Sequence, residues 1–436
     1  MKTYYLDQFG CAKNQVEGET LLLHLNASGF LQADSPLDAE FIIINSCGFI
    51  EAAKKESIKA VLEYKNAYPN AKIVLCGCLP IRYEDDLRST LHEADIIFAG
   101  KDLSGLVNNL VTDTAVSDLA VFDKNIGTRP LLSLPGSAYI KISDGCNNCC
   151  TFCAIPLIRG RLRSRSIEDI CSEAKTLIER GVKELCLVAQ DASSYGIDWS
   201  GKCMLNELLR SLAKIRGEFW VRLLYLHPDH FPLEILDTIK NDERFLPYFD
   251  IPFQHAADKI LRAMNRRGTC EKYLDLIDVI RTKLGNAVIR STFLTGFPGE
   301  TEDDFNTLLV FQAKAKLDWA GFFTYSKEDG TPAFNLKNSG ATKSVSKKIA
   351  LQRKNILEEA QTKISTIAVK RFIGIKTKAL VEEEMGDGLY LGRLFCHAPS
   401  VDGSAIIETS QKLKCGSFTD VEVFASSLFD LRVRKI

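Results

Sequence analysis

Short apolar runs alternate with helix-like segments along most of this chain. Near the N-terminus the runs are TYYLDQF at 3–9, FIIINS at 41–46 and KIVLCG at 72–77, separated by segments such as QVEGETLLLHL. This alternation is typical of buried parallel strands, which need a crossover helix between one strand and the next. The first part of the chain, residues 1–125, is therefore expected to be an α/β domain built on a parallel sheet.

The same alternation continues with longer units between residues 132 and 365. Six further strands are expected, and they read AYIKISD, ELCLVAQD, WVRLLYL, YFDIPF, VIRSTFLTGF and WAGFFTYS. A closed barrel of this type has eight strand–helix units, so six units predict a partial (β/α)6 barrel. The segment at 112–136 has little periodicity and is expected to be the linker that precedes this domain.

The pattern changes again near the C-terminus. A basic helical segment, VSKKIALQRKNILEEAQTKIST, leads into short alternating runs that include IGIKTKALVEE, GLYLGRLFC, SAIIETS and DVEVFASS. Alternating runs of this length without helices between them predict a small all-β barrel, of OB or similar type, at residues 369–436.

Composition favours an ordinary globular protein in a reducing compartment. Apolar residues make up 46% of the 436 residues and charged residues 25%, and the net charge of −1 gives no sign of a nucleic-acid or membrane partner. The N-terminus lacks the apolar stretch of a signal peptide, and no run is long enough to span a membrane. A cytoplasmic location is expected, where the 14 cysteines suit metal or redox sites better than disulfides.

Four cysteines crowd the stretch GCNNCCTFC at 145–153. As zinc ligands they form two C-x-x-C pairs, but these pairs abut, whereas zinc knuckles are normally joined by a longer segment. Cys146, Cys150 and Cys153 form the alternative set, three thiolates on one loop that can bind three corners of a 4Fe-4S cluster and leave one iron open. Cys149 is then an unligated neighbour. The loop follows the first barrel strand, at the strand end where barrel chemistry belongs.

Cysteines spaced three and two residues apart, with Phe152 before the last, resemble the signature of the radical S-adenosylmethionine (SAM) superfamily. The resemblance implies that the open iron binds SAM, which is cleaved reductively to methionine and a 5'-deoxyadenosyl radical inside the barrel. The residues we expect near SAM follow barrel strands or the cysteine loop, and they are Phe152, Gln190, Gly296, Pro298 and Gly299.

Three other cysteines each follow a predicted N-terminal strand: Cys11 in FGCAKN, Cys47 in NSCGFI and Cys78 in CGCLPIRY. Single buried cysteines often serve only as small apolar residues. The carboxyl ends of parallel strands meet at one sheet edge, however, so three cysteines in equivalent places predict a second site with three ligands. Cys78 is preferred to Cys76, because it comes after the glycine that ends the strand.

The order of these features resembles the methylthiotransferases, in which a cluster-bearing N-terminal domain precedes a radical SAM barrel and a TRAM domain. Stretches such as ISDGCNNCCTFCAIPLIRGRLRSR, FDIPFQHA and STFLTGFPGETEDDF are most similar to the branch that modifies an aspartate of small-subunit ribosomal protein S-twelve. Ala12, Cys149 and His227 depart from the family's usual residues.

The resemblance implies two 4Fe-4S clusters, the first on Cys11, Cys47 and Cys78 and the second on Cys146, Cys150 and Cys153. It implies that a methylthio group is transferred to the aspartate β-carbon, with SAM consumed in both halves of the reaction. An electron donor and a sulfur donor are then needed as partners.

Two alternatives remain open. One is methylthiolation of isopentenyladenosine in tRNA, and the other is a metal-bearing RNA or ribosome-binding protein without catalysis. From residue 370 onward the sequence contains ten Lys and Arg residues and nine Asp and Glu residues. A tRNA-binding module is expected to be clearly basic, so this balance favours a protein substrate and no tRNA.

Weaker signals lie near the predicted site. Arg159, Arg161, Arg163 and Arg165 form a basic run that is either a solvated face or meets carboxylates or phosphates at the cavity mouth. Several polar residues fall at expected strand ends, where each forms a structural hydrogen bond or contacts substrate or SAM: Gln190, Asp191, Gln254, His255 and Tyr325.

Overall fold

The N-terminal strands form one parallel sheet in the computed structural model, which describes residues 2–112, 126–336 and 344–436. Five strands pair in the order β2-β1-β3-β4-β5, and every pairing is parallel. The elements are β1 (Thr3–Gln8), α1 (Ala12–Ala27), β2 (Leu31–Gln32), β3 (Phe41–Ser46), α2 (Glu51–Ala67), β4 (Lys72–Gly77), α3 (Cys78–Thr90), β5 (Ile96–Ile97) and α4 (Leu103–Thr112). The predicted parallel α/β domain is confirmed; the two-residue strands β2 and β5 are too short to give a periodic pattern.

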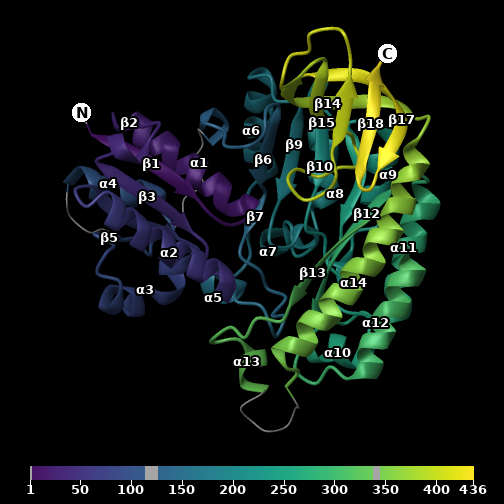
Figure 1. Ribbon diagram of the computed structural model, residues 1–436, viewed down its shortest axis with the longest axis horizontal. Coiled ribbons are helices and arrows are strands. Elements are labelled where there is room, and N and C mark those ends of the chain that lie inside the picture. Colours follow the sequence, from purple (N-terminus) through teal and green to yellow (C-terminus); the bar gives the residue numbers. More distant parts are fainter. Residues whose placement is uncertain (1, 113–125, 337–343) are drawn as a thin grey trace.

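Both faces of this sheet are covered by helices, as Figure 1 shows. Successive residues of a strand point to opposite faces. In β3, Ile43 therefore packs with Leu21 of α1, whereas Ile42 and Ile44 pack on the other face with Val61 of α2. Burial on both faces explains why this strand reads as a continuous apolar run.

The central domain holds six parallel strands in the order β13-β12-β11-β10-β9-β6, which is their sequence order along the sheet. The predicted partial barrel is confirmed. Its elements are β6 (Ser137–Lys141), β7 (Ser143–Asp144), α5 (Ile155–Arg159), β8 (Arg163–Ser164), α6 (Ile167–Glu179), β9 (Glu184–Val188), α7 (Ile197–Ser200), α8 (Leu205–Leu212), β10 (Trp220–Leu223), α9 (Ile235–Asn241), β11 (Phe245–Asp250), α10 (Asp258–Ala263), α11 (Cys270–Lys283), β12 (Val288–Thr295), α12 (Glu302–Ala315), β13 (Trp319–Thr324), α13 (Pro332–Leu336) and α14 (Lys347–Ala368).

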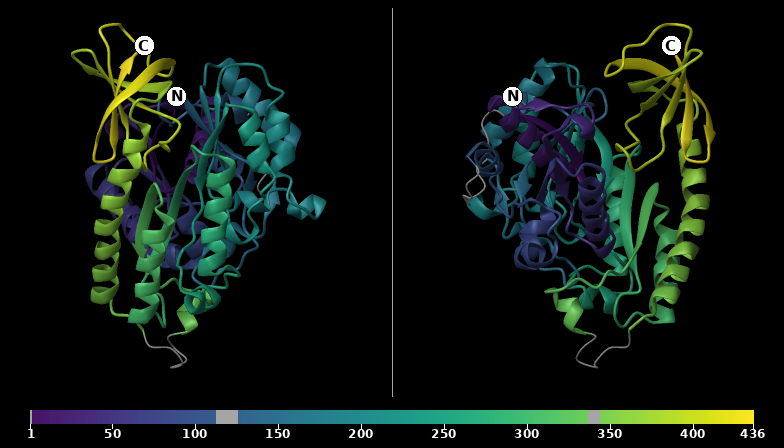
Figure 2. Two further views of the ribbon diagram at one scale, coloured as in Figure 1. Left: turned by 90° about the vertical axis from the view of Figure 1, so that its right-hand side faces the viewer. Right: turned by 60° about the vertical axis from the view of Figure 1, so that its left-hand side comes forward.

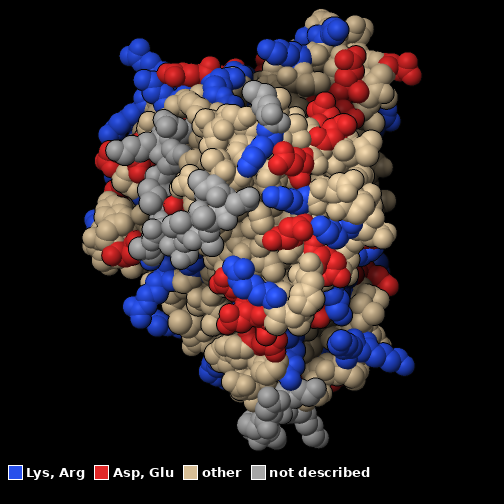
Figure 3. Space-filling view, turned by 90° about the vertical axis from the view of Figure 1, so that its left-hand side faces the viewer, with Lys and Arg blue, Asp and Glu red and all other residues tan. Residues whose placement is uncertain are grey.

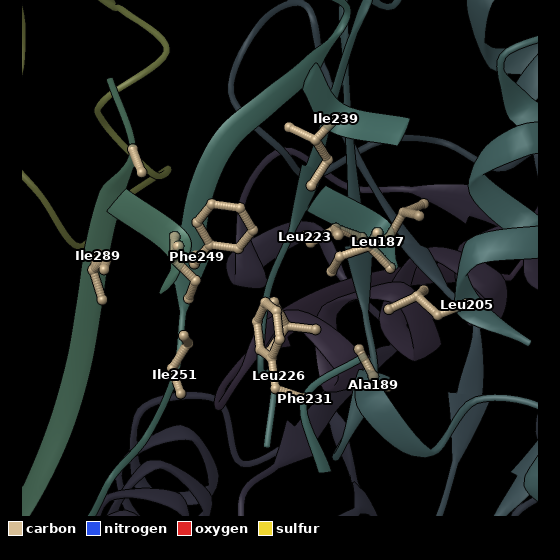
Figure 4. Close-up of a cluster of buried hydrophobic side chains, with 14 of the residues drawn as sticks. Leu187, Ala189, Leu205, Leu223, Leu226, Phe231, Ile239, Phe249, Ile251 and Ile289 are labelled. Atoms are coloured by element: carbon tan, nitrogen blue, oxygen red, sulfur yellow. The ribbon is translucent and has the colours of Figure 1, made fainter. Parts of the chain in front are cut away.

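The largest apolar cluster lies between this sheet and its outer helices. Figure 4 shows Leu187, Leu223, Phe249 and Ile289, one from each of four neighbouring strands, in that cluster together with Leu205 of α8. The outer face of the sheet is therefore a packed core, and the opposite face is left for the other two domains.

The C-terminal residues form a closed five-stranded barrel, as predicted. Its strands are β14 (Lys376–Gly386), β15 (Leu389–Arg393), β16 (Ala405–Glu408), β17 (Phe418–Ser427) and β18 (Asp430–Lys435). This barrel packs on the inner face of the central sheet, where Trp220, Tyr248 and Val288 share one apolar cluster with Val381 and Ile407 (Figure 2). The strand ends near β7 are left to the N-terminal domain.

The predicted linker at 112–136 is only partly within the described residues, because 113–125 lie outside them. Its second half is more ordered than the lack of periodicity suggests. Arg129 is fully buried and forms ion pairs with Glu19 of α1, at 2.8 Å, and Glu173 of α6, at 2.6 Å. This part of the linker therefore joins the N-terminal domain to the central domain through buried charges.

Candidate functional site

The three N-terminal cysteines lie at one edge of the first sheet. Cys11 stands at the N-terminus of α1, Cys47 follows β3, and Cys78 opens α3. The loops approach closely, because a side chain on Gly10 would come within 3.2 Å of Cys47 Cβ and one on Gly48 within 2.8 Å of the Cys78 carbonyl oxygen. The structure brings these cysteines together, and we call them the first triad.

Two cations stand beside the first triad. Arg159 Nη2 donates to Cys78 Sγ at 2.9 Å, and burial raises the pKa of Cys78 to about 11 against the opposing effect of Arg159. Cys11 is open to solvent on one side. Desolvation by the surrounding protein acts to raise the pKa of Cys11, but Lys13 and the backbone N–H of Asn14 outweigh it, so this pKa is lowered. Both cations favour the thiolate, which is the form that binds metal.

The second triad consists of Cys146, Cys150 and Cys153 and lies on the loop between β7 and α5. The Cys153 backbone N–H donates to the Cys150 carbonyl at 3.1 Å, which closes a turn within the loop. Gly145 begins the loop with φ of 72°, and a side chain there would come within 2.1 Å of the Arg161 carbonyl oxygen. The loop geometry therefore requires glycine at this position.

Burial dominates the electrostatics of the second triad. It raises the pKa of Cys146 and of Cys153 to about 12, with a smaller contribution from the Cys150 thiol and an opposing one from nearby backbone N–H groups. At Cys150 burial also raises the pKa, whereas the guanidinium of Arg266 lowers it. The Cys150 thiol thus acts on both of its partners in the triad.

Cys149 differs from its neighbours. Its backbone has φ of 52°, its side chain is exposed, and its Sγ lies 3.5 Å from the Asn147 carbonyl oxygen of the same loop. The Asn265 side chain donates to the Cys149 carbonyl at 3.1 Å. Cys149 thus contributes to the turn through its backbone. That it is not a ligand stays a prediction.

The donor chemistry of both triads suits an iron–sulfur cluster. All 14 cysteines are free, and each triad combines three sulfur atoms from a short loop or adjacent loops with an arginine at one of them. In the described part of the chain, no group of three His, Cys, Asp or Glu side chains is placed to hold a single metal ion. Their role as cluster ligands stays a prediction.

A buried layer of charges separates the two triads and joins their domains. Glu17 of α1 accepts from Lys141 of β6 at 2.8 Å and from Arg159 of α5. Asp144 lies 3.9 Å from both cations. Arg159 ends the helix that begins two residues after Cys153 and contacts Cys78, so it connects one triad to the other.

Of the four arginines in the basic run after the second triad, two are buried against carboxylates and two form a solvated face. Arg159 and Arg165 are buried and meet carboxylates, Glu17 and Glu173 respectively. Arg161 and Arg163 are exposed. The sequence did not separate these pairs, because which arginines turn inward depends on carboxylates from distant elements.

A second contact between the domains is centred on Glu328, which follows β13. This carboxylate is almost fully buried and accepts from Arg82 at 2.8 Å and from Lys54 at 3.1 Å. It also accepts from the backbone N–H of Glu51 at 2.9 Å, at the start of α2. Helices α2 and α3 are thereby fixed to the far edge of the central sheet, and we call this contact the Glu328 latch.

Two of the residues expected near SAM lie beside the second triad. Phe152 is partly buried and packs on the apolar cluster that contains Met264 and Phe297. Gln190 donates to Asp144 at 3.1 Å, while its carbonyl oxygen is buried with no partner among the described residues. A buried polar atom without a partner is costly unless a ligand satisfies it.

The GFPGE turn has a structural explanation of its own. The backbone N–H of Gly296 donates to Glu300 at 2.6 Å, and Glu300 also accepts from Arg353 at 2.7 Å. A side chain on Gly296 would come within 2.4 Å of Ala350 Cβ. These hydrogen bonds and this packing account for the turn without a ligand. Contact of Gly296, Pro298 and Gly299 with SAM stays a prediction.

Of the polar residues expected at strand ends, Asp191 lies beside the second triad, together with polar groups that were not predicted. Asp191 accepts from Asn148 at 2.7 Å and lies 2.7 Å from His230 Nε2. Despite burial, which acts to raise it, the pKa of Asp191 is lowered to about 2 because His230 bonds to the carboxylate. Arg266 and His227 each keep a buried nitrogen without a partner in the part of the chain described. No local pattern marks Arg266 as a site residue, since it meets the cysteine loop only in the fold.

A cavity of about 420 Å³ lies elsewhere, between residues 134–135 and the C-terminal barrel. It is lined by Glu382, Arg393 and Asp402 among others and by none of the predicted site residues. The candidate site is therefore defined by the two triads and the charged layer between them.

Three family models match successive parts of the chain. They are described as "Uncharacterized protein family UPF0004", over residues 3–99, "Radical SAM superfamily", over 140–311, and "TRAM domain", over 373–436. Among solved structures, the radical SAM methyltransferase TsrM from Kitasatospora setae is similar with a TM-score of 0.54 at 14% identity, covering 76% of this chain and 74% of TsrM. The cobalamin-dependent radical SAM enzyme OxsB has a TM-score of 0.55 at 13% identity, covering 78% of this chain and 56% of OxsB. At such identities the likeness concerns the fold alone.

Curated relatives match almost the whole chain. The protein named ribosomal protein uS12 methylthiotransferase RimO from Treponema denticola is 43% identical over 98% of this chain and 99% of the relative. The protein of the same name from Aquifex aeolicus is 40% identical over 98% of this chain and 95% of the relative. On these matches the chain belongs to the RimO family of methylthiotransferases, within the radical SAM superfamily.

Proposed function

We propose that this protein is an enzyme that transfers a methylthio group to the β-carbon of an aspartate in ribosomal protein uS12. The observation that carries the proposal is that Cys78 of the first triad shares a buried cluster with Ala154, the residue after Cys153 of the second triad, and accepts from Arg159 across the domain interface. A reaction that joins a carbon centre to a sulfur group needs both held in one enclosed place.

The cluster ligands we propose are the two triads: Cys11, Cys47 and Cys78 for the auxiliary 4Fe-4S cluster, and Cys146, Cys150 and Cys153 for the cluster that binds SAM. When bound, these groups would supply the one-electron chemistry and the sulfur and methyl groups of the reaction. The SAM-contacting residues we propose are Phe152, Gln190, Gly296, Pro298 and Gly299. Of these, Gln190 has the strongest support, because its carbonyl oxygen is buried without a described partner beside the second triad.

The protein's own residues would hold the two triads in register and keep water out. Glu17 and Asp144 balance the charges of Lys141 and Arg159 in the buried layer between the domains. The Glu328 latch closes the other side of the interface through Arg82 and Lys54. Exclusion of water protects reactive intermediates from side reactions.

We propose the domain limits 1–125 for the N-terminal cluster domain, 132–365 for the radical SAM barrel and 369–436 for the TRAM domain. The matches at 3–99, 140–311 and 373–436 lie within these limits and support the order of the domains. The buried ion pairs of Arg129 with Glu19 and Glu173 mean that the first two domains act as one unit.

An electron donor and a sulfur donor are further partners that we propose on chemical grounds, and we place the reaction in the cytoplasm, where uS12 is made. No helix among the described residues is long and apolar enough to cross a membrane. On the face in Figure 3, basic and acidic side chains are interspersed and do not gather into a basic patch. The described residues of that face therefore lack the concentration of positive charge that tRNA binding requires. The near-neutral balance of charged residues from residue 370 onward supports a protein substrate over tRNA.

The test is an anaerobic assay of the full chain reconstituted with iron and sulfide. SAM and dithionite are added, and uS12 and tRNA are followed separately by mass spectrometry. We expect a methylthio gain on one aspartate of uS12, lost in Cys150→Ala and retained in Cys149→Ala, which removes the exposed neighbour. A gain on tRNA alone would assign the sister activity, and iron replaced by zinc with no SAM cleavage would point to a non-catalytic protein.

A further inference from the structure

Lys13 is a buried cation in the first turn of α1, two residues after Cys11. Only 7% of its surface is exposed. Its ammonium lies 3.5 Å from the ring centroid of Tyr225, a residue that follows β10 of the central domain. Lys13 therefore projects from the N-terminal domain toward the carboxyl ends of the barrel strands, where the second triad also lies.

The other buried cations of this interface are matched by carboxylates. Lys141 and Arg159 share Glu17, and Arg290 lies 3.0 Å from Asp250. Among the described residues no Asp or Glu forms a direct ion pair with Lys13, whose close contact is the Tyr225 ring. Burial acts to lower the pKa of Lys13, but Tyr225, Cys11 and Asp250 outweigh it, so this pKa is raised and the ammonium stays charged. A buried ammonium with no carboxylate in contact keeps part of its desolvation cost, because a cation–π contact offsets that cost only in part.

Tyr225 is held in an unusual backbone conformation. Its φ is 63°, in the left-handed region that non-glycine residues rarely adopt. The conformation is fixed on both sides, because the Tyr225 N–H donates to Asp250 at 3.3 Å and its carbonyl accepts from Ala192 at 2.9 Å. Such strain collects at functional sites, and here it aims the ring at the Lys13 ammonium.

A ligand can approach the buried Lys13 ammonium past neighbouring residues that are exposed to solvent. Cys11 and Gly10 are exposed, and Tyr225 is only partly buried. An acidic side chain entering beside Cys11 would find a cation that no carboxylate of the described residues contacts directly, and it would lie at the edge of the first triad.

We propose that Lys13 binds the side-chain carboxylate of the substrate aspartate and makes the enzyme selective for an acidic residue. The inference rests on the proposed function. In aspartate the carboxylate carbon is bonded directly to the β-carbon, so an ion pair at Lys13 positions the reacting carbon beside the first triad. Tyr225 is the positioning residue that holds the ammonium.

Lys13 has an alternative role, which is to balance the negative charge of a cluster bound at Cys11. In that case substitution would change the cluster and leave the choice of substrate unaffected. The two roles therefore differ in whether Lys13 is coupled to the charge of the substrate.

The test is a double-mutant cycle between the reconstituted enzyme and uS12. Lys13→Met removes the charge at similar length, and Asp→Asn at the modified position of uS12 removes the substrate carboxylate. Equilibrium affinities of the four pairs, iron content and product formation are measured, with Lys59→Met as the exposed control.

We expect wild type to bind native uS12 at least about tenfold more tightly than the Asn form, because close charge pairs at interfaces couple strongly. Lys13→Met should bind both forms equally and lose roughly a hundredfold in kcat/KM, while Lys13→Arg recovers part of the selectivity and Lys59→Met matches wild type. Equal loss of affinity for both forms, or loss of iron with the selectivity intact, would overturn the proposal. Failure of wild type to modify uS12 would instead overturn the proposed function.

Discussion

Gly145 illustrates how one residue controls the shape of the second triad. Its φ of 72° costs an alanine about 1–2 kcal/mol, and the added Cβ would stand 2.1 Å from the Arg161 carbonyl oxygen. Cys146 follows Gly145 directly, and its N–H donates to the Gly160 carbonyl at 3.2 Å, so a shift of the backbone at Gly145 or Arg161 would displace Cys146. The glycine is therefore a requirement of the cysteine loop, although it ligates nothing.

We predict that Gly145→Ala loses the cluster of the second triad and keeps that of the first. Iron per chain after anaerobic reconstitution should fall to about half, and SAM cleavage should stop, because a displaced loop no longer presents three thiolates to one cluster. Gly181→Ala is the matched control, since Gly181 also has positive φ, at 94°, but nothing within 4 Å of an added Cβ. Full iron content in Gly145→Ala would contradict this account of the loop.

At the scale of elements, α2, α3 and the segment after β13 are joined by the Glu328 latch. Both cations of the latch are well buried, with side-chain exposures of 3% for Arg82 and 11% for Lys54. Removing one partner of a buried ion pair is far more destabilising than removing an exposed pair, because the remaining charges stay desolvated.

We predict that Glu328→Gln destabilises the interface by about 3–5 kcal/mol, whereas Glu63→Gln, in an exposed pair with Lys59, changes stability by less than about 1 kcal/mol. Hydrogen exchange should rise at the start of α2 and in α3, which lose their link to the central domain. Unchanged exchange in these helices would show that Arg129 and the buried layer suffice to hold the domains together.

At the scale of the whole molecule, the C-terminal barrel is a fixed part of the central domain. Besides the shared apolar cluster, Asp402 of this barrel accepts from Tyr248 of the central sheet at 2.6 Å and lies 3.5 Å from Arg290 Nε. Burial raises the pKa of Asp402 to about 6, with Arg290 acting in the opposite direction.

This pKa predicts how docking of the barrel depends on pH. Between an ordinary value near 4 and the folded value of about 6, the folded state binds a proton that the unfolded state has released, so stability falls as pH rises through this window. Relative to Asp402→Asn, wild type should lose about 1 kcal/mol of stability between pH 5 and pH 7.5. Denaturant unfolding of both proteins at the two pH values measures the difference. Parallel pH profiles would show that Asp402 is ionised throughout this range.

At this scale, the features that could be predicted from the sequence are those whose interacting residues lie close together in the chain. Strands β1, β3 and β4, the six central strands and the closed C-terminal barrel were predicted, because each depends on the spacing of apolar residues within a few positions. The positions of the cysteines after those strands were equally local, so both triads could be chosen before the fold was known. The burial of the second half of the linker was not predicted, since the ion pairs of Arg129 depend on Glu19 and Glu173 from two other elements.

The sequence by itself therefore determined the order of the three domains and the strand pattern of each, and it predicted two sets of three cysteines whose role as ligands stays a prediction. Only the tertiary structure decided that Arg159 contacts Cys78, that Lys13 lies over Tyr225 without a carboxylate, and that the C-terminal barrel covers the inner face of the central sheet. The physical reason is that strands follow from contacts between near neighbours in the chain, whereas buried charges find their partners across domains. The low dielectric of the interface makes an unpaired buried charge costly, so these charges must pair. No local sequence pattern shows which residues form the pairs.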